Sequence, residues 1–230
     1  MSDKQIKLIV TPESQPSRSV MILCKMVKLP HEIIKIDVFD PDDRSDILQP
    51  ANPKMQVPVL QHGSLNIAES TAIFRYINNL VEDKSLFNYH DLTSRILTEN
   101  FFVYYHQNVR PITRLTTGQI FMPDFLKKFF DVEKDIELTE KILLMLVDNY
   151  PSISSGYILG ERFSICDILL FCEIMQLNLL GYDIVNKHPQ VWAYLQRCSK
   201  GRPELREAHF ENEKLARTNN HTSWFDLFNL

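Results

Sequence analysis

The first 81 residues alternate between short apolar runs and amphipathic segments. Residues 7–11 (KLIVT) are rich in β-branched side chains, which predicts a buried strand. A turn with two prolines follows at 12–16, and a helix is predicted after it. Its apolar side chains share one face: Val20, Leu23, Cys24 and Val27. A strand, a turn and a helix therefore open the chain.

A second strand and a hairpin follow in the same region. Residues 32–38 (EIIKIDV) predict the second strand, and the polar, acidic stretch 39–52 leaves room for one short helix. Residues 57–60 (VPVL) form a short strand entered through a proline. A turn at His62-Gly63 leads to residues 65–68, which complete the hairpin.

An amphipathic helix ends this region. Glu69 and Ser70 open the helix, and apolar side chains recur at helical spacing through residues 73–81. The predicted order is therefore β-α-β-α-β-β-α. Strands joined through a helix should be parallel, whereas the last two are close enough in sequence to pair antiparallel. We place a first domain at residues 1–81.

The rest of the chain has the periodicity of helices. Residues 82–90 are polar and break the pattern, which indicates a linker before a second domain at 91–230. The last apolar segment, 224–228 (WFDLF), should dock on the folded chain because it is too apolar to remain in solvent. The helical segments expected before it are 91–110, interrupted by Pro111, then one around 138–146, and 164–180, 190–200 and 203–217.

Composition and charge exclude several classes of protein. The 230 residues suffice for two domains, and 44% hydrophobic with 23% charged residues is typical of a soluble globule. The net charge is −4 and the 25 Lys and Arg are scattered, which argues against nucleic acid and against a membrane surface as partners. The longest apolar run, 142–147, is too short to span a bilayer. Residues 1–10 lack the apolar core of a signal peptide, so we expect a cytoplasmic protein.

The cysteines, histidines and acidic residues do not predict a metal site. Cys24, Cys172 and Cys198 stand on apolar helix faces and should be buried free thiols, while the environment of Cys166 stays open. The seven histidines lack zinc spacing. The aspartates at 37–46 lack the glycine and the distal glutamate of a calcium loop, so we interpret them as a solvated loop.

Two features in the first domain indicate a ligand site. Pro58 cannot donate a hydrogen bond within a strand, so it predicts a turn, often with a cis bond, that exposes the backbone of Val57; a plain edge-strand proline is the alternative. Glu69 and Ser70 at a helix start offer free N–H groups to an anion, although such a pair can also be a simple cap.

The first loop supplies a third feature. Ser14-Gln15-Pro16-Ser17 lies where thioredoxin-type proteins carry C-x-x-C, and the two serines make dithiol exchange impossible there. A serine hydroxyl can instead donate a hydrogen bond to a bound thiolate. A free thiol with a pKa near 8.5 is only about 3% ionised at pH 7, so such a donor would raise the reactive fraction. Ser14 as a simple N-cap is the alternative interpretation.

Taken together, these motifs resemble the glutathione transferase family, and its theta class in particular. The resemblance is specific over residues 5–81 and looser to about residue 217. It rests on three runs: Ser14, Gln15, Pro16 and Arg18; Asn52, Pro53, Val57 and Pro58; and Glu69, Ser70, Ala72 and Ile73. It implies an α/β plus all-α fold, with a thioredoxin-like N-terminal domain (βαβαββα) and an all-helical C-terminal domain. Ser164 and Asp167 resemble the helix-capping box of that second domain.

The resemblance also implies roles for individual residues. Ser14 would stabilise the glutathione thiolate, and Arg110 would lie near the sulfur. Val57 would pair its backbone with the cysteinyl part of glutathione, beside a cis Pro58. Glu69 and Ser70 would hold the γ-glutamyl end.

Two positions depart from the theta-like pattern. The basic residues expected at the glycyl carboxylate are replaced by Asp43 and Gln56. A carboxylate facing another carboxylate would repel the ligand, so Arg44 is the candidate to take over this contact. If Arg44 does not reach, glutathione should bind poorly.

The second substrate, a small electrophile such as an alkyl or aryl halide or a hydroperoxide, would lie in the domain cleft. Tyr104 and His106 on the long helix are candidates for its pocket, with helix packing as the alternative. Trp224 and Phe225 would either cover the cleft or pack on the outer surface of the helical domain. The resemblance further implies a homodimer, a role in detoxification, and glutathione as co-substrate with no metal. A non-catalytic ligand-binding or assembly module of the same fold is the alternative function.

Overall fold

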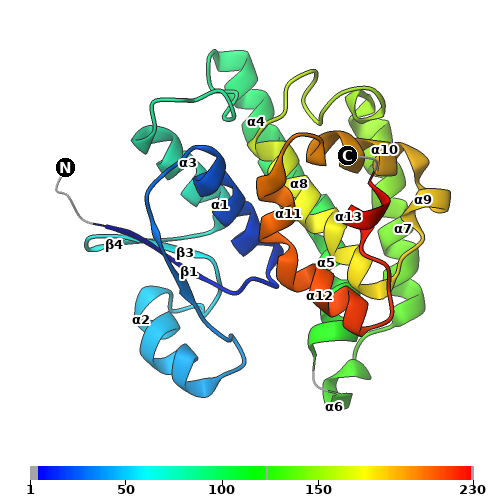
Figure 1. Ribbon diagram of the computed structural model, residues 1–230, viewed down its shortest axis with the longest axis horizontal. Coiled ribbons are helices and arrows are strands. Elements are labelled where there is room, and N and C mark those ends of the chain that lie inside the picture. Colours follow the sequence, from blue (N-terminus) through cyan, green and yellow to red (C-terminus); the bar gives the residue numbers. More distant parts are fainter. Residues whose placement is uncertain (1–4, 123, 229–230) are drawn as a thin grey trace.

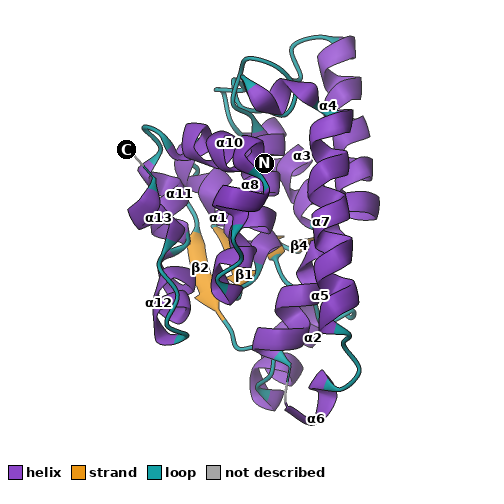
Figure 2. Cartoon of the chain, turned by 90° about the vertical axis from the view of Figure 1, so that its right-hand side faces the viewer, coloured by secondary structure: helices purple, strands orange, loops and turns teal. Residues whose placement is uncertain are grey.

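A computed structural model describes residues 5–122 and 124–228. Figure 1 shows a sheet with its own helices on one side of the molecule and a larger group of helices on the other. Figure 2 looks from the helical side, and the strands lie behind the helices. Residues 1–4, part of the segment inspected for a signal peptide, are outside the described residues.

The sheet has the predicted topology. Its strands are β1 (Ile6–Val10), β2 (Glu32–Lys35), β3 (Val59–His62) and β4 (Leu65–Ala68), in the spatial order β2-β1-β3-β4. β1 is parallel to β2, and β3 is antiparallel to both β1 and β4. The parallel pair and the hairpin are therefore confirmed. β3 begins two residues later than predicted, at Val59, because Pro58 has no N–H for the ladder.

Helices cover both faces of this sheet. The face that carries Leu8 and Val10 packs against α1 (Gln15–Met26) and α3 (Ser70–Leu80). The opposite face carries Ile9, which packs with Leu48 under a π-helical turn (Asp43–Leu48) and α2 (Gln49–Ala51). Figure 1 shows α1 and α3 on one side of the strands and α2 on the other. The period of two along β1 thus supplies apolar side chains to two cores.

The second part of the chain is helical, as predicted. The long segment before Pro111 is α4 (Leu92–Tyr104), and the chain continues as a π-turn (Tyr105–Val109) and a 3₁₀ turn (Arg110–Ile112). Pro111 therefore changes the winding without reversing the chain. The remaining helices are α5 (Thr113–Thr116), α6 (Asp124–Lys127), α7 (Val132–Asn149), α8 (Ile165–Ile174), α9 (Ile184–Lys187), α10 (Pro189–Ser199), α11 (Pro203–Ala208), α12 (Phe210–Thr218) and α13 (Trp224–Leu227).

Helix α8 is the centre of the helical domain. All ten of its residues are buried, and α1 of the first domain packs against it. The predicted capping box is confirmed: the Asp167 carboxylate accepts from the backbone N–H and the hydroxyl of Ser164 at 2.8 and 2.9 Å. One continuous apolar cluster joins α8 to α1 and β1, so the two domains share a core.

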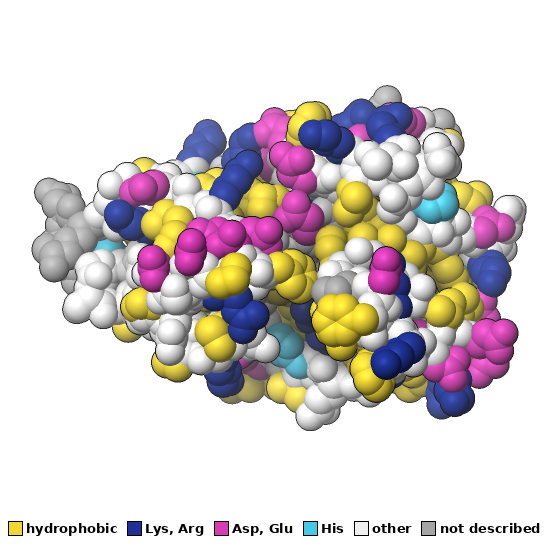
Figure 3. All heavy atoms as spheres, turned by 90° about the horizontal axis from the view of Figure 1, so that it is seen from below, with side chains coloured by type: hydrophobic (Ala, Val, Ile, Leu, Met, Phe, Trp, Pro, Cys, Tyr) yellow, Lys and Arg dark blue, Asp and Glu magenta, His cyan; other side chains and the backbone are white. Residues whose placement is uncertain are grey.

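The cysteines and the acidic loop lie where the sequence predicts. Cys24, Cys172 and Cys198 are buried free thiols, and so is Cys166, whose environment the sequence left open. Burial raises the pKa of Cys24 and of Cys172 to about 12, so both are inert thiols at neutral pH. The aspartates at 37–46 are mostly exposed, and Figure 3 shows acidic side chains in a row on that face. Among the residues described, no helix has the length and apolarity needed to cross a bilayer.

Candidate active site

A cavity of about 520 Å³ opens between the sheet domain and the helices that follow α4. Residues far apart in the sequence line it, and they come from the loop after β1, the segment before β3, the start of α3 and the turns around residue 110. The predicted residues that the structure brings together here are Ser14, Gln56, Val57, Pro58, Glu69, Ser70, His106 and Arg110.

Ser14 is the N-cap of α1. Its Oγ accepts the backbone N–H of Ser17 at 3.4 Å, and this contact leaves the hydroxyl proton of Ser14 available to another acceptor. The first turn, Gln15-Pro16-Ser17-Arg18, carries no acidic residue that would offset the positive end of the helix. Ser14 can therefore be both a cap and a donor to an anion in the cavity.

The backbone beside Ser14 is shaped by Val57-Pro58. Their peptide bond is cis, and strand pairing begins only at Val59. The backbone groups of Val57 are consequently outside the ladder and line the cavity. Asn52, itself buried, holds this segment by donating to the Gln56 carbonyl at 2.8 Å.

The start of α3 forms the next wall. Glu69 has a positive φ of 68°, which is unusual for a residue with a side chain, and Ser70 behind it is buried. The Glu69 carboxylate lies 3.7 Å from the ammonium of Lys54. A conformation held against its intrinsic preference at the edge of a cavity favours a functional role for Glu69.

Arg110 reaches the cavity from the helical side. Its Nη1 donates to both carboxylate oxygens of Glu173, at 3.2 and 3.1 Å, and Tyr105 donates its hydroxyl to the same carboxylate at 2.7 Å. Burial lowers the Arg110 pKa, but the Glu173 charge outweighs it and the pKa is raised above its usual value. Burial and then Glu173 raise the pKa of Tyr105, so both residues keep their protons at neutral pH.

Four predicted residues lie elsewhere: Tyr104, Trp224, Phe225 and Arg44. Tyr104 faces α7, where its hydroxyl accepts from Asn149 at 3.3 Å and its ring lies 5.1 Å from Tyr150; Tyr105, one position on, lines the cavity instead. Trp224 and Phe225 do not cover the cleft. Their rings lie 6.0 Å from Trp192 and Phe171 respectively, because helices α10 and α8 offer them an apolar slot.

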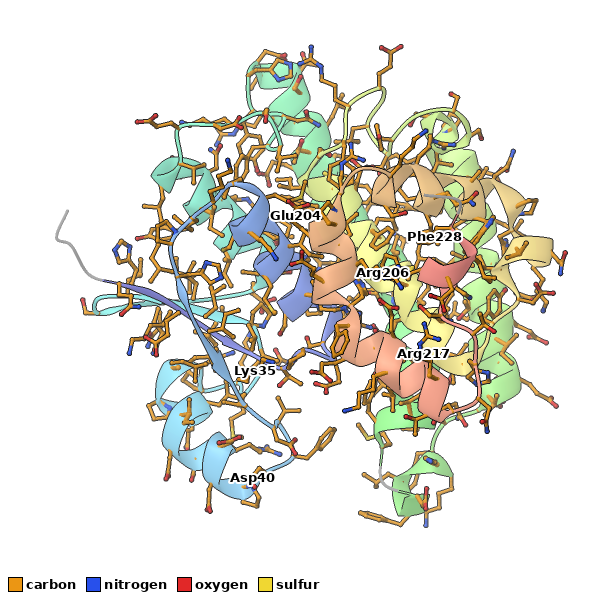
Figure 4. The ribbon with its side chains drawn as sticks, viewed as in Figure 1. Lys35, Asp40, Glu204, Arg206, Arg217 and Phe228 are labelled. Carbon is orange, nitrogen blue, oxygen red and sulfur yellow. The ribbon has the colours of Figure 1, made fainter. Side chains whose placement is uncertain are left out.

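Polar contacts also hold the C-terminal segment that contains these aromatic residues on the helical domain. Arg206 and Arg217 both pair with Asp226, and Figure 4 shows the two arginines on α11 and α12, with Phe228 close to α13. The packing of the C-terminus on the outer surface of the helical domain, one of the two arrangements expected, is the one observed.

Arg44 does not reach the cavity either. Its Nη2 lies 3.7 Å from the sulfur of Met55, which lines the cavity, and Arg44 itself lines a separate small pocket on the other side of Met55. Asp43 also faces away, because its carboxylate accepts the backbone N–H of Asp37 at 2.8 Å. Asp43 therefore does not face the glycyl carboxylate and would not repel it. Arg44, however, does not supply a cation to that carboxylate.

Sequence reasoning missed several residues that line or support the cavity. Met55 and Thr117 line it but belong to segments without a periodic pattern. Glu173 had a detectable signal, since it is a charged residue near the end of a helix whose other residues after Asp167 are apolar. Within the described part of the chain, no group of three His, Cys, Asp or Glu side chains is arranged to hold a metal ion.

Two family models match the chain. Residues 8–85 match the N-terminal domain of glutathione S-transferases, and residues 114–201 match the C-terminal domain. The chain belongs to the glutathione S-transferase family. The matched ranges include the sheet side of the cavity and Thr117, whereas Tyr105, His106 and Arg110 lie between the two ranges.

Theta-class proteins are among the relatives of this transferase. The mouse protein glutathione S-transferase theta-2 is 26% identical over 205 residues, which cover 85% of this chain and 82% of the relative. Glutathione S-transferase T1 of Arabidopsis thaliana is 25% identical over 218 residues, which cover 89% of this chain and 88% of the relative. The similarity therefore extends over most of both proteins in each comparison.

Solved structures share the fold. Human glutathione S-transferase T1-1 in its apo form superposes with a TM-score of 0.79 at 21% identity, covering 94% of this chain and 92% of that one. Human glutathione transferase theta-2 in complex with glutathione gives a TM-score of 0.78 at 21% identity, covering 95% of this chain and 93% of that one. The thioredoxin-like domain followed by a helical domain is thus confirmed.

Proposed function

We propose that this protein transfers glutathione to small electrophiles and that Ser14 stabilises the glutathione thiolate. The observation that carries the proposal is the common location of three features. The donor hydroxyl of Ser14, the backbone of Val57 before the start of β3, and the start of α3 line one cavity of about 520 Å³. This volume suits a small-molecule ligand.

Glutathione would lie along the sheet side of the cavity. Its cysteinyl backbone would pair with Val57 beside the cis Pro58, and its γ-glutamyl end would meet Glu69 and Ser70. The carboxylate of Glu69 suits the ammonium of the γ-glutamyl group, and the N–H groups at the start of α3 suit its carboxylate. This orientation brings the sulfur toward Ser14.

The reaction needs the thiolate, which is scarce in solution. At pH 7 only about 3% of a thiol with a pKa near 8.5 is ionised. Donation from the Ser14 hydroxyl, the positive end of α1 and the charge of Arg110 would lower that pKa. With an alkyl halide, the sulfur then forms a bond to carbon while the carbon–halogen bond breaks, and the halide leaves with the bonding electron pair.

The electrophile would enter from the helical side. Tyr105, His106 and Thr117 line that part of the cavity, and Thr71 lies 3.4 Å from the His106 ring. Holding both reactants in one cavity supplies proximity and orientation. No proton-relay histidine is required, because the leaving group carries away its own charge.

A non-catalytic binding module of the same fold is the second candidate. One observation favours it: Arg44 lies behind Met55 instead of facing the glycyl end. Retention of the chain on immobilised glutathione, combined with turnover of an aryl halide, discriminates between the two. The enzyme binds and turns over, whereas the module lacks turnover.

The variant Ser14→Ala tests the role of the hydroxyl. Ser14→Ala should keep binding to immobilised glutathione and lose turnover about 100-fold, the size of effect expected for a lost stabilising donor. Ser17→Ala is a matched control in the same loop. The Ser17 Oγ is buried and has no hydrogen-bond partner in the part of the chain that the structure describes, so its removal should leave turnover unchanged. Equal losses in both variants would contradict the proposal.

We also propose a homodimer that works in the cytosol. Leu92, Ile96 and Val103 on α4 are 74, 57 and 56% exposed, and this apolar row is suited to contact with a second copy of the chain. Light scattering should give twice the chain mass, and Ile96→Glu should give the mass of one chain. The four free cysteines support a reducing compartment.

A further inference from the structure

Glu173 is a charged residue in a mostly apolar helix. It lies on α8, all of whose residues are buried, and its own side chain has no exposed surface. A buried carboxylate is costly unless hydrogen bonds and an opposite charge compensate it. The groups that compensate the charge of Glu173 connect it to the wall of the cavity and to the Ser14 loop.

In the part of the chain that the structure describes, the donors to Glu173 all come from the segment that forms the helical wall of the cavity. Oε2 accepts from Tyr105 at 2.7 Å and from Arg110 at 3.1 Å. Oε1 accepts from Arg110 at 3.2 Å and from the Thr113 hydroxyl at 2.5 Å. Two of these three residues, Tyr105 and Arg110, line the cavity itself.

The same network crosses to the first domain. The Thr113 oxygen accepts from Nε2 of Gln15 at 2.5 Å and also from Arg110. Gln15 is the residue directly after Ser14 and is buried. Glu173 is therefore linked through one hydroxyl to the loop of Ser14, and directly to the arginine on the opposite wall.

Arg110 is oriented by this arrangement. Within residues 5–122 and 124–228, its hydrogen bonds are all made by Nη1, which points to Glu173 and Thr113. The other N–H groups of the guanidinium are free to face the cavity. A flexible side chain with one end fixed loses less conformational freedom when it meets an anion.

We propose that Glu173 is a positioning residue for the transfer reaction, which holds Arg110 and the Ser14 loop in the geometry that meets the glutathione sulfur. This inference rests on the proposed function, because it concerns the same sulfur. Glu173 is not part of the cavity lining and acts through its contacts with Arg110, Tyr105 and Thr113, the last of which also bonds Gln15.

Removal of the Glu173 carboxylate should change the pKa of the bound thiol in one direction through charge and in the opposite direction through positioning. Loss of a nearby negative charge alone would make the cavity more positive and lower the pKa of the bound thiol. Loss of the anchor would let Arg110 and the Ser14 loop move, which weakens thiolate stabilisation and raises that pKa. The direction in which Glu173→Gln shifts the thiol pKa therefore distinguishes an effect of charge alone from an effect of positioning.

The experiment measures the thiol pKa of bound glutathione from the ultraviolet absorbance of the thiolate, together with kcat and KM. Glu173→Gln should raise the thiol pKa by about 1 and lower kcat at pH 6.5 about fivefold. KM for glutathione should change less than about twofold, since the peptide is bound by the sheet domain. The deficit in kcat should shrink as the pH rises and the thiol ionises without help.

Glu99→Gln is a matched control. The Glu99 carboxylate also accepts from an arginine and a tyrosine, Arg75 at 2.9 Å and Tyr89 at 2.7 Å, but these two partners do not line the cavity. Glu99→Gln should leave the thiol pKa and kcat unchanged. In the background of Arg110→Ala, Glu173→Gln should add little further loss, because it acts mainly through Arg110.

Each outcome decides the inference. An unchanged or lowered thiol pKa in folded Glu173→Gln, or losses that add fully to those of Arg110→Ala, would overturn it. If Glu173→Gln does not fold, Thr113→Val removes three hydrogen bonds of the network and keeps the charge. A raised thiol pKa in Thr113→Val supports the inference, and an unchanged one overturns it. A wild-type chain that neither binds nor turns over glutathione would overturn the proposed function and this inference together.

Discussion

Arg18 on α1 donates through Nη2 to the side-chain oxygen of Gln176, 2.6 Å away in the 3₁₀ turn that follows α8. This contact joins the two domains at a point where neither residue is exposed to solvent. The other end of the guanidinium donates to the carbonyls of Pro12 and Glu13, at 3.0 and 2.7 Å. One buried cation thus ties the loop before Ser14 to the helical domain.

Arg18→Met should destabilise the protein by about 3 kcal/mol, because it leaves several buried oxygen acceptors without a donor. Burial lowers the Arg18 pKa, which reflects the cost of keeping this cation inside the protein. The methionine side chain avoids that cost but has no N–H group for the acceptors. Urea unfolding measures the loss. Arg95→Met, at an exposed position, should change stability by less than about 0.5 kcal/mol, and a similar cost at both positions would contradict this role of Arg18.

The glycyl end of glutathione should be a weak point of this site. Gln56 lines the cavity, and Arg44 is held behind Met55. Gln56→Lys places a cation at this edge and should lower KM for glutathione about fivefold at low salt, with a smaller gain at high salt. An unchanged KM across salt concentrations would mean that the glycyl carboxylate lies elsewhere.

The packing of the C-terminus predicts that Trp224 contributes stability and no specificity. Trp224 is 3% exposed and its backbone N–H donates to Asn178 at 3.0 Å. Trp224→Ala should cost about 3 kcal/mol of stability. KM for the electrophile should be unchanged at a temperature where the variant is folded. A selective change in that KM would indicate that the tail covers the cleft after all.

Histidine titration should weaken the fold in mild acid. His209 is buried, donates from Nδ1 to the Leu205 carbonyl at 2.6 Å and faces the rings of Phe171 and Phe225. Burial, and then the Arg18 charge, hold the His209 pKa well below 6.5. Because the unfolded chain binds a proton near pH 6.5 and the folded one does not, this stabilisation is present above pH 6.5 and is lost below it.

His209→Gln should remove that part of the pH dependence. Between pH 7.5 and 5.5 the wild-type protein should lose about 1.4 kcal/mol through this residue, and the variant should not. Urea unfolding at both pH values gives the comparison. Parallel losses in the two proteins would show that His209 protonates equally well in the folded state.

Local pattern predicted the elements of the first domain well. The β-branched run at 7–11 and the helical spacing after Ser70 are properties of a few neighbouring residues, and both elements formed as expected. The start of β3 moved to Val59 because a proline cannot join a ladder. The turns that replace one long helix around Pro111 depend on packing against α7 and α8, which no local pattern reports.

The candidate site was predictable where backbone geometry decides it. Ser14, Val57, Glu69 and Ser70 lie at element ends, and motif spacing located them. Long side chains were harder to place, since Arg44 contacts the sulfur of Met55 and the ring of Tyr104 turns toward α7. Such orientations follow from tertiary neighbours on distant segments of the chain.

The pKa of the glutathione thiol in the complex tests the account most directly. Wild-type protein should lower it to about 6.5, roughly two below its value in solution, and Ser14→Ala should return it to within about 0.5 of that value with glutathione still bound. A bound thiol that ionises as in free solution in the wild type, or equally in wild type and Ser14→Ala, would contradict the central role of Ser14.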